Sequence, residues 1–375
     1  MTGRYAHGLV IGKFYPPHLG HQHLVTRAAE RCEEVTVLVM AARRETISLD
    51  DRVAWLREAV APYPQVAVSG VTCDVPVDYG DGAVWAAQVA VMQAALARDG
   101  RPPVSAVVSS ELYGRELADR LRADHIAVDV GRTVVPVSAS EIRADLYGAW
   151  DMLIPPAQAA LATRVVVLGA ESTGTTTIAG LLAAHYRSRG GPWKRVPCVG
   201  EYGRDYTIIK WDAACAAGRP EPSLEDISWD SSDFDIVGPE QTRRENEAAR
   251  SARAPLVVCD TDAFATSVWE RRYLGNAARD RQAWASSELP LHDVYLLTSH
   301  EGVPWHDDGL REGDLEVRAA MTGWFAAALT GAGHSWVLLT GSQEDRLRLA
   351  VRSVDLALED KASFGASITE AARAD

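Results

Sequence analysis

Two histidines three residues apart, His18 and His21, have the types and the spacing to act on a phosphate chain. An apolar run, Gly8–Ile11, precedes them and predicts a buried strand, and residues 21–30 predict a helix. Backbone N–H groups at such a strand–loop–helix junction form an anion site. Because residues three apart share one helix face, both imidazoles can donate hydrogen bonds to phosphate oxygens and to a growing negative charge.

These histidines also have more ordinary interpretations. A single histidine on a helix face is usually a surface residue, and two at this spacing can bind a metal. However, no glutamate or third ligand accompanies them in the pattern of a zinc protease. Gly12 and Gly20 let the backbone approach a bulky phosphate chain, while Pro16 and Pro17 end the strand and stiffen the turn. The stretch therefore favours a phosphate site.

The stretch from Gly12 to His21 resembles the G-x-F-x-P-x-H-x-G-H signature of the nucleotidylyltransferase superfamily. The resemblance implies transfer of a nucleotide from ATP without a covalent enzyme intermediate. In that reaction His18 and His21 stabilise the transition state, and Lys13 contacts the phosphate chain. The residues of this stretch expected around the bound nucleotide are Gly12, Phe14 and Tyr15.

A second cluster, Val137–Arg143, has a structural and a chemical interpretation. Ser138, with Glu141 three residues later, predicts a capping box at a helix start. The cluster also resembles the I-S-x-T-x-I-R element of the same superfamily, with Ser140 where the family often has threonine. On that resemblance the hydroxyls of Ser138 and Ser140 hold the triphosphate, and Arg143 neutralises the departing pyrophosphate.

Further matches make the first half similar to the NadR-type family, which joins nicotinamide mononucleotide (NMN) adenylyltransferase to ribosylnicotinamide kinase. They are Ser109-Ser110-Glu111, Asp129, Arg132-Thr133, Trp150 and Ile154-Pro155. The resemblance adds Arg132 to the nucleotide site. It also places Trp85 where the family carries an aromatic residue that stacks on the nicotinamide ring, which suits a cationic pyridinium. A core tryptophan on an amphipathic helix is an equally good interpretation of Trp85.

A second phosphate loop lies near the middle of the chain. Arg164–Leu168 predicts a buried strand, a helix is predicted from Ile178, and Gly169–Thr177 has the layout G-x-x-x-x-G-[K]-[S/T]. Thr176 supplies the hydroxyl for Mg²⁺. Thr175 stands where a lysine is expected, so the charge that usually follows the γ-phosphate is missing. The residues predicted to bind ATP here are Gly169, Glu171, Ser172, Gly174, Thr175, Thr176 and Thr177.

Three further motifs resemble the kinase half of the same family, in its order. Glu201–Asp205 resembles E-Y-G-R-E/D, an apolar strand leads to Asp260 and Asp262, and Trp305–Arg311 resembles W-x-D-D-G-L-R. The resemblance implies that Arg311 reaches the phosphates, and a guanidinium there can replace the absent lysine. The riboside and kinase site is expected to contain Glu201, Tyr202, Arg204, Asp260, Asp262 and Asp308, with Asp260 also a magnesium ligand.

Strands and helices that can position these motifs alternate along the first half. Val35–Met40 and Val104–Ser110 predict strands, and Arg52–Val60 and Trp85–Arg98 predict helices. Such alternation is typical of doubly wound parallel sheets, in which ligands bind at the carboxyl ends of the strands. The predicted fold class is therefore α/β.

The expected organisation is two domains. A Rossmann-like nucleotidylyltransferase domain covers residues 1–156, a linker or connecting helix follows at 153–163, and a P-loop kinase-like domain covers 164–360. Within the second domain, residues 218–238 predict a long loop or lid, 334–340 a last strand, and 342–359 a last helix. Residues 361–375 are expected to be a flexible tail.

Composition limits the classes of function. A net charge of −13 over 375 residues argues against general nucleic-acid binding, though not against small nucleotides. Five scattered cysteines without a C-x-x-C pair predict reduced thiols, and no signal peptide or bilayer-spanning stretch is visible, so a cytoplasmic protein is expected. The expected partners are ATP with Mg²⁺, NMN, NAD and nicotinamide riboside, without nucleic acid or membrane. Whether the chain forms a homo-oligomer stays open.

Four functions compete at this point. The first is an NAD-salvage enzyme with both activities. The second is an adenylyltransferase whose kinase-like domain binds nucleotide without chemistry, and Thr175 favours it. FMN adenylyltransferase with riboflavin kinase fits poorly, because that kinase is a small β-barrel without a phosphate loop. A transcriptional regulator also fits poorly, because the chain is acidic and begins directly with the first strand.

Overall fold

The computed structural model describes residues 3–217, 227–275, 278–279, 292–304 and 315–365. The chain forms two compact units. The first contains the residues up to Ala160 together with the stretch that begins at Ala362, and the second is Leu161–Lys361. This division lies between the two domains expected from the sequence.

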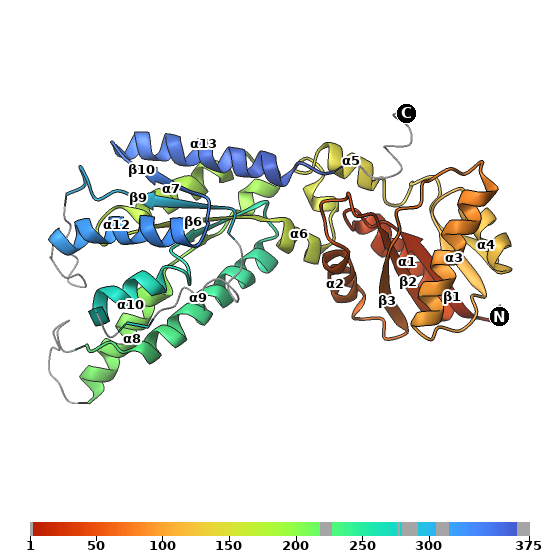
Figure 1. Ribbon diagram of the computed structural model, residues 1–375, viewed down its shortest axis with the longest axis horizontal. Helices are drawn as coiled ribbons and strands as arrows, with labels where there is room; N and C mark the ends of the chain where they lie inside the picture. Colours follow the sequence, from red (N-terminus) through yellow and green to blue (C-terminus); the bar gives the residue numbers. More distant parts are fainter. Residues whose placement is uncertain (1–2, 218–226, 276–277, 280–291, 305–314, 366–375) are drawn as a thin grey trace. The chain divides into compact units, whose positions relative to one another are not determined.

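The N-terminal unit is built on a five-stranded parallel sheet with the order β3-β2-β1-β4-β5 (Figure 1). The strands are β1 (Tyr5–Gly12), β2 (Cys32–Ala41), β3 (Val66–Thr72), β4 (Ala106–Ser109) and β5 (Asp124–Ala127). The helices are α1 (Leu19–Arg31), α2 (Leu49–Val60), α3 (Gly82–Arg98), α4 (Gly114–Leu121), α5 (Ala139–Ala144) and α6 (Pro155–Leu161). The central strand β1 is apolar and fully buried at Leu9 and Val10, as its sequence predicts.

Helices cover both faces of this sheet because of the way the chain crosses over. Right-handed crossovers place α1 and α2 on one face as the strands proceed from β1 to β3, and α3 and α4 on the other as they return to β4 and β5. The core on the second face joins Leu9 and Leu38 of the sheet to Met92 and Leu117 of the helices. The sheet order therefore reverses between β1 and β4.

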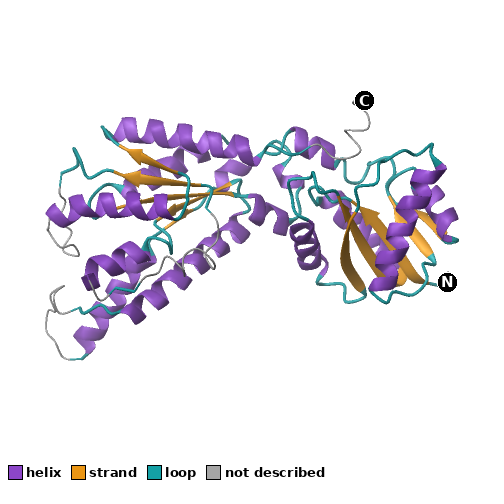
Figure 2. Cartoon of the chain, in the orientation of Figure 1, coloured by secondary structure: helices purple, strands orange, loops and turns teal. Residues whose placement is uncertain are grey.

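The C-terminal unit also has a five-stranded parallel sheet, with a different strand order, β10-β9-β6-β8-β7, in which β8 and not β7 pairs with β6 (Figure 2). Its strands are β6 (Thr163–Gly169), β7 (Cys198–Val199), β8 (Leu256–Asp260), β9 (Val294–Thr298) and β10 (Trp336–Leu339). Its helices are α7 (Thr175–Arg187), α8 (Tyr202–Ala216), α9 (Ser231–Ala252), α10 (Thr266–Leu274), α12 (Leu315–Gly331) and α13 (Gln343–Lys361). The α/β class predicted from the sequence is confirmed in both units.

One expected loop is wrong in part. Residues 231–238 form the first turns of α9, because the side chain of Asp230 accepts the N–H of Ser232 and so caps the helix. Phe234 and Val237 are buried and anchor these turns. Residues 218–226 of the same expected loop lie outside the described residues.

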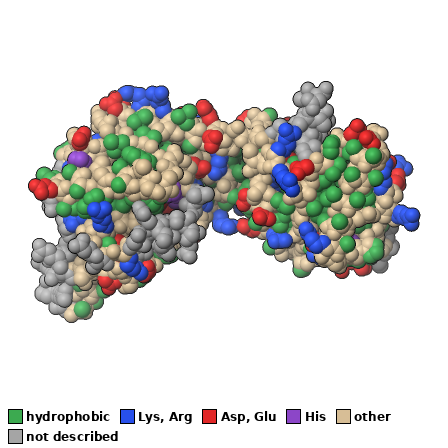
Figure 3. Space-filling model, viewed as in Figure 1, with side chains coloured by type: hydrophobic (Ala, Val, Ile, Leu, Met, Phe, Trp, Pro, Cys, Tyr) green, Lys and Arg blue, Asp and Glu red, His purple; other side chains and the backbone are tan. Residues whose placement is uncertain are grey.

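The surface and the cysteines add little that is unusual. On the face drawn in Figure 3, acidic and basic side chains are interspersed among other residues. All five cysteines are free thiols, as expected. Within the described ranges, no helix has both the length and the apolar character needed to cross a bilayer.

Candidate functional site

The first site lies at the carboxyl ends of β1 and β4, where the strand order reverses. In a doubly wound sheet this is where loops diverge and leave a crevice for a ligand. The cavity there is lined by His18, Gly20, His21, His23, Leu24, Ser110, Glu111, Val128, Asp129, Arg132, Val135, Val137, Ser138, Ala139 and Ser140. Four site residues predicted from the two motifs, His18, His21, Ser138 and Ser140, therefore meet in one cavity, although the two motifs lie more than a hundred positions apart in the sequence.

The two histidines stack on each other at the start of α1. His18 is the N-cap residue, and its ring centroid lies 3.6 Å from that of His21. The backbone N–H of His18 donates to Nδ1 of His21 at 3.2 Å. Since Nδ1 accepts this hydrogen bond, a neutral His21 carries its proton on Nε2. Nδ1 of His18 is buried and has no hydrogen-bond partner among the described residues.

Both imidazoles are neutral near pH 7. Burial and then the charge of Arg132 lower the pKa of His18 to about 4, against the opposing effect of Glu141. Burial, followed by the charges of His18 and Arg132, lowers the pKa of His21 well below its usual value. The pair can therefore offer N–H groups to a phosphate without changing protonation state at physiological pH.

Lys13, Phe14 and Tyr15, which the sequence places around the nucleotide, are not among the residues that line this cavity. Nζ of Lys13 lies 3.4 Å from a carboxylate oxygen of Glu45. The buried ring of Phe14 lies 4.7 Å from the ring of His21, centroid to centroid, and Tyr15 is fully buried. These side chains support the loop that carries the histidines.

The two glycines of the loop allow close packing of its own side chains. A Cβ on Gly12 would lie 3.1 Å from the Phe14 ring, and one on Gly20 would lie 3.0 Å from the His18 ring. Both distances are tighter than ordinary contacts, so a larger residue would push the aromatic rings aside.

The second motif begins α5 beside the histidines. The N–H of Ser138 donates to the Glu141 carboxylate at 2.6 Å, and the N–H of Glu141 donates to Ser138 Oγ at 3.2 Å. The predicted capping box is therefore confirmed. The Arg143 guanidinium donates to Ser140 Oγ at 3.2 Å and to the Tyr15 carbonyl, which joins this motif to the first loop.

Trp85 and Arg132 occupy different environments. Arg132 lines the cavity and its guanidinium lies 2.9 Å from the Glu111 carboxylate. Trp85 of α3 is 5% exposed and packs in the hydrophobic core between the helices and the sheet. Its indole N–H donates to the Tyr79 carbonyl at 3.2 Å. This environment agrees with the interpretation of Trp85 as a core residue. Its stacking on a nicotinamide ring stays a prediction.

The second site surrounds the loop between β6 and α7. The predicted strand–loop–helix layout is confirmed, and the helix begins at Thr175 rather than Ile178, with Gly174 at φ 87° as its N-cap. A Cβ on Gly169 would lie 2.2 Å from the Thr298 hydroxyl, so only glycine fits there. Backbone N–H groups at the start of α7 therefore form an anion site.

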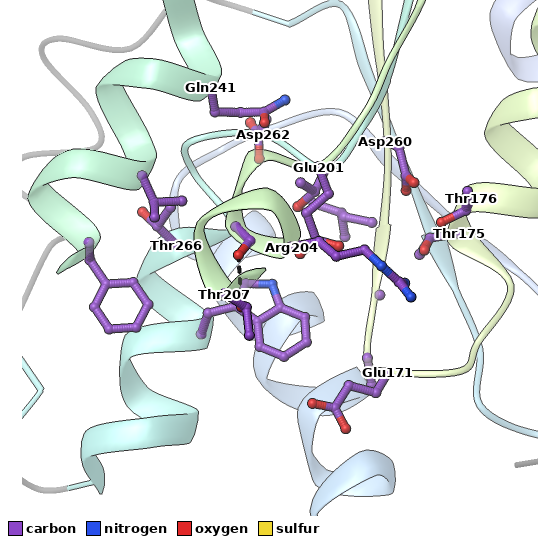
Figure 4. A pocket seen from close by; sticks show the side chains of 18 of the residues that line it. Glu171, Thr175, Thr176, Glu201, Arg204, Thr207, Gln241, Asp260, Asp262 and Thr266 are labelled. Carbon is purple, nitrogen blue, oxygen red and sulfur yellow. Dashed lines mark hydrogen bonds between the residues drawn. The ribbon is translucent and has the colours of Figure 1, made fainter. Parts of the chain in front are cut away.

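A pocket opens beside this loop, and most of the predicted residues that the structure describes line it. They are Gly169, Glu171, Ser172, Thr175, Thr176, Glu201, Arg204, Asp260 and Asp262. Figure 4 shows the Arg204 side chain extending from α8 toward Thr175, with Thr176 and Asp260 on the same side of the pocket. Asp260 and Asp262 are 5% and 2% exposed.

The remaining predicted residues lie elsewhere. The N–H of Tyr202 donates to the side chain of Gln241 at 2.9 Å, and its ring packs under the Arg244 guanidinium. Gly174 and Thr177 lie at the start of α7. Asp308 and Arg311 lie outside the described residues.

Part of the pocket lining is an aromatic wall that sequence reasoning missed. Trp229, Phe234, Trp269 and Tyr273 line it. The rings of Trp229 and Tyr273 are stacked with centroids 5.3 Å apart. These residues come from the segment before α9, from α9 and from α10, and no local motif connects them.

Two buried arginines that hold the phosphate loop were also missed. Arg318 of α12 donates to the carbonyls of Glu171 (3.1 Å) and Ser172 (2.8 Å). Arg346 of α13 donates to the carbonyl of Thr173 at 3.1 Å. Their partners lie about 150 positions away or more, so nothing in the local sequence signals this role.

Comparisons with known proteins agree with this geometry. Residues 9–145 match the cytidylyltransferase-like family, and residues 164–346 match the AAA domain. The trifunctional NAD biosynthesis/regulator protein NadR of Salmonella typhimurium is 25% identical over 316 residues, which cover 81% of this chain and 71% of that protein. A nicotinamide-nucleotide adenylyltransferase of Aeropyrum pernix is 34% identical over 80 residues, 17% of this chain and 46% of that protein.

Among solved structures, the crystal structure of a NadR protein in complex with NAD and AMP-PNP is similar in fold. Its TM-score is 0.66 at 19% sequence identity, and the match covers 96% of this chain and 98% of that one. The likeness in fold extends over both units.

Proposed function

Because the chain belongs to the NadR-type family, we propose that it makes NAD with two activities. The N-terminal unit transfers AMP from ATP to NMN, and the C-terminal unit phosphorylates nicotinamide riboside to supply NMN. The observation that carries the first activity is the stacked pair His18 and His21 at the sheet's switch point, in one cavity with Arg132 and three serines. An adenylyltransferase with a silent second unit is not favoured, because the curated relative matches across both units and is described as trifunctional.

In the N-terminal unit, the 5′-phosphate of NMN attacks the α-phosphorus of ATP. A P–O bond forms to the NMN phosphate as the bond to the β-phosphate breaks, and pyrophosphate leaves. Two positioned phosphates need alignment and charge stabilisation rather than a covalent intermediate. Nε2–H of His21 donates to the oxygens on which charge grows, and His18 completes the pair.

Cationic and hydroxyl groups complete the adenylyl-transfer site. Arg143, held against Ser140 by its hydrogen bond, faces the departing pyrophosphate. Ser138 and Arg132 line the same cavity and contact the triphosphate. Lys13 exchanges its ion pair with Glu45 for the phosphate chain when ATP binds.

In the C-terminal unit, ATP binds with its phosphates on the N–H groups of the loop from Gly169 to Thr176. Oxygen ligands suit Mg²⁺, and the Thr176 hydroxyl and Asp260 carboxylate lie on one side of the pocket in Figure 4. These two residues would hold the ion, which would neutralise negative charge on the phosphates. The riboside hydroxyl attacks the γ-phosphorus while Asp262 accepts its proton, and the bond from the γ-phosphorus to the bridging oxygen breaks so that ADP leaves.

The cation that replaces the missing lysine is Arg204 or Arg311. Arg204 lines the pocket and extends toward Thr175, the position of the absent lysine (Figure 4). A guanidinium can contact two phosphate oxygens at once. Arg311, the candidate from the sequence, lies outside the described residues, so the observation favours Arg204.

The aromatic wall fits the base of the riboside. Nicotinamide riboside carries a cationic pyridinium, and such a ring binds to indole and phenol faces. Trp229, Trp269 and Tyr273 line the same pocket as the phosphate loop and can supply such faces. A cytoplasmic location accords with five free thiols and is part of the same proposal.

Product analysis tests both activities. Purified protein with ATP and Mg²⁺ is incubated with NMN in one tube and with nicotinamide riboside in another, and products are separated by liquid chromatography. NAD with pyrophosphate is expected from NMN, and NMN followed by NAD from the riboside. A first tube without NAD contradicts the adenylyltransferase, and a second tube with neither NMN nor NAD contradicts the kinase.

A further inference from the structure

We propose that Glu245 and His292 are positioning residues of the second site. Through buried hydrogen bonds they hold Asp262 and the first turn of α8 in place around the riboside. The inference rests on the proposed kinase activity, and nothing in the two phosphate-loop motifs includes either residue. Its basis is a continuous chain of side chains that crosses the unit behind the pocket.

The chain of hydrogen bonds starts at α8 and reaches the middle of α9. The backbone N–H of Tyr202 donates to Oε1 of Gln241 at 2.9 Å, and Nε2 of Gln241 donates to Oε1 of Glu245 at 3.1 Å. The other oxygen of Glu245 lies 2.9 Å from Nε2 of His292. Gln241 and Glu245 are one helical turn apart, so both side chains point to the same side of α9.

From His292 the hydrogen bonds continue to Asp262, just after the end of β8. Nδ1 of His292 lies 3.1 Å from the Tyr295 hydroxyl, which donates to Oδ2 of Asp262 at 2.8 Å. The carboxylate of Asp262 also accepts the N–H of Ala265 at 3.0 Å. The orientation of Asp262 is thereby fixed from two sides.

The residues at the two ends of this hydrogen-bond network line the pocket, and the residues in its middle do not. Gln241 and Asp262 line the pocket, as does Glu201, which precedes Tyr202. Glu245 is fully buried, and the His292 side chain is 2% exposed. Buried polar groups that are fully hydrogen-bonded fix one arrangement of the elements they join. Here those elements carry the residues that face the riboside.

The charges support the same arrangement. Burial lowers the pKa of His292, but its hydrogen bond to Glu245 and the nearby Asp262 carboxylate outweigh burial and raise it overall. An imidazolium between two carboxylates compensates charges that would otherwise be costly to bury. Removing any one of Glu245, His292 and Asp262 therefore disturbs the charge balance of the other two.

A metal site is the competing interpretation of this cluster. Single ligand atoms of Glu245, Cys259 and His292 lie within 4.8 Å of one another. However, both nitrogens of His292 and both oxygens of Glu245 already have hydrogen-bond partners. Burial also raises the pKa of the Cys259 thiol well above its usual value, which disfavours the thiolate that a metal needs. Hydrogen bonding is therefore the better interpretation, and zinc becomes an outcome of the test.

The first test compares Glu245→Leu with Glu245→Gln in the full chain. Leucine removes both hydrogen bonds, whereas glutamine keeps the shape and one acceptor for Gln241, and its amide N–H can donate to Nε2 of a neutral His292. We expect kcat/KM for nicotinamide riboside to fall on the order of tenfold to a hundredfold in Glu245→Leu and to be largely restored in Glu245→Gln. KM for ATP in the kinase reaction, and NAD synthesis from NMN in the same preparation, should not change. Cys259→Ala is the matched control at a neighbouring buried position and should behave as wild type.

A more conservative variant keeps the inference testable if Glu245→Leu does not fold. Tyr295→Phe removes one hydroxyl from the chain and leaves the ring packed, so a smaller fall in riboside kcat/KM is expected. Equal effects on ATP and riboside constants in these variants would mean that the cluster supports only the core. Riboside kinetics unchanged in both Glu245→Leu and Tyr295→Phe would also overturn the inference.

Hydrogen exchange provides a readout that does not need kinase activity. Peptides that cover the start of α8 should exchange faster in Glu245→Leu than in wild type, because the Tyr202 N–H loses its fixed acceptor, while α7 keeps its protection. A wild type without kinase activity would refute the proposed kinase, and exchange at α8 would still decide the positioning role. Unchanged exchange there, or stoichiometric zinc in the purified wild type that Cys259→Ala removes, would overturn it.

Discussion

The two sites share the same backbone arrangement, a strand–loop–helix junction, and differ in which parts of the sequence supply their side chains. Each begins with a glycine-containing loop between a central parallel strand and a helix, at β1 and at β6. At the first site, the chemically active groups come from short motifs around His18 and Ser138. At the second, the pocket is assembled from several elements separated in the chain. A local motif therefore specifies a phosphate site far better than it specifies the rest of a substrate site.

The sites also differ in how they present aromatic groups and positive charge. The aromatic residue expected at the first site, Trp85, is in the core, whereas Trp229 and Trp269 line the second pocket. The first site has arginines and neutral imidazoles beside its loop, while the second lacks the loop lysine at Thr175. Each contrast can be tested by a substitution in one unit, with the activity of the other unit as the internal control.

The largest effect is expected from Trp85→Ala. Deleting a buried tryptophan side chain costs about 3–5 kcal/mol of unfolding free energy, and the affinities for NMN and ATP should then fall together. Calorimetric melting of the full chain and ligand titration measure both quantities. A selective loss of NMN binding by tens-fold, without a lower melting temperature, would instead show that the ring stacks on nicotinamide.

His21→Ala is expected to lower the rate of NAD synthesis from NMN by about a hundredfold to a thousandfold. The substitution removes the Nε2–H donor and the acceptor of the His18 N–H. Steady-state production of pyrophosphate measures the loss, and riboside phosphorylation should be unaffected. Near-normal NAD synthesis would remove His21 from the catalytic role.

The sequence predicts the fold well, and it predicts which two loops meet at the first cavity, because both depend on local patterns. The strand–loop–helix junctions and the capping box at Ser138 follow from neighbouring residues. The aromatic wall, the network through Glu245, and the buried Arg318 and Arg346 could not be predicted in this way. Their contacts join positions tens to hundreds of residues apart, and only tertiary packing brings them together.

Arg204→Ala is expected to lower riboside phosphorylation by about tenfold to a hundredfold, since one positioned cation is lost. If Arg204 replaces the loop lysine, Thr175→Lys should be nearly neutral in the wild type and should restore activity to Arg204→Ala. The four-variant cycle is measured with initial rates of NMN formation. Full activity in Arg204→Ala together with complete loss in Arg311→Ala would assign the role to Arg311.

The last effect expected is a loss of stability of the N-terminal unit in mild acid. Since burial lowers the pKa of His18 to about 4 and that of His21 well below its usual value near 6.5, the unfolded chain binds these protons first as pH falls. The stabilisation is therefore fully present above pH 6.5 and is lost as pH falls toward the folded pKa values. The slope is about 1.4 kcal/mol per pH unit for each imidazole.

The pH range of this loss of stability distinguishes the two histidines from the carboxylates of the N-terminal unit. Hydrogen bonds from Ser138 lower the pKa of Glu141, so its contribution is lost only below its ordinary value of 4.5. Hydrogen exchange of N-terminal peptides between pH 6.5 and 5, corrected for intrinsic rates, measures the slope. In His18→Gln one of the two imidazoles is absent, so the slope should fall by about half. A slope equal to that of wild type would mean that His18 is protonated in the folded protein, and that it meets the phosphates as a cation.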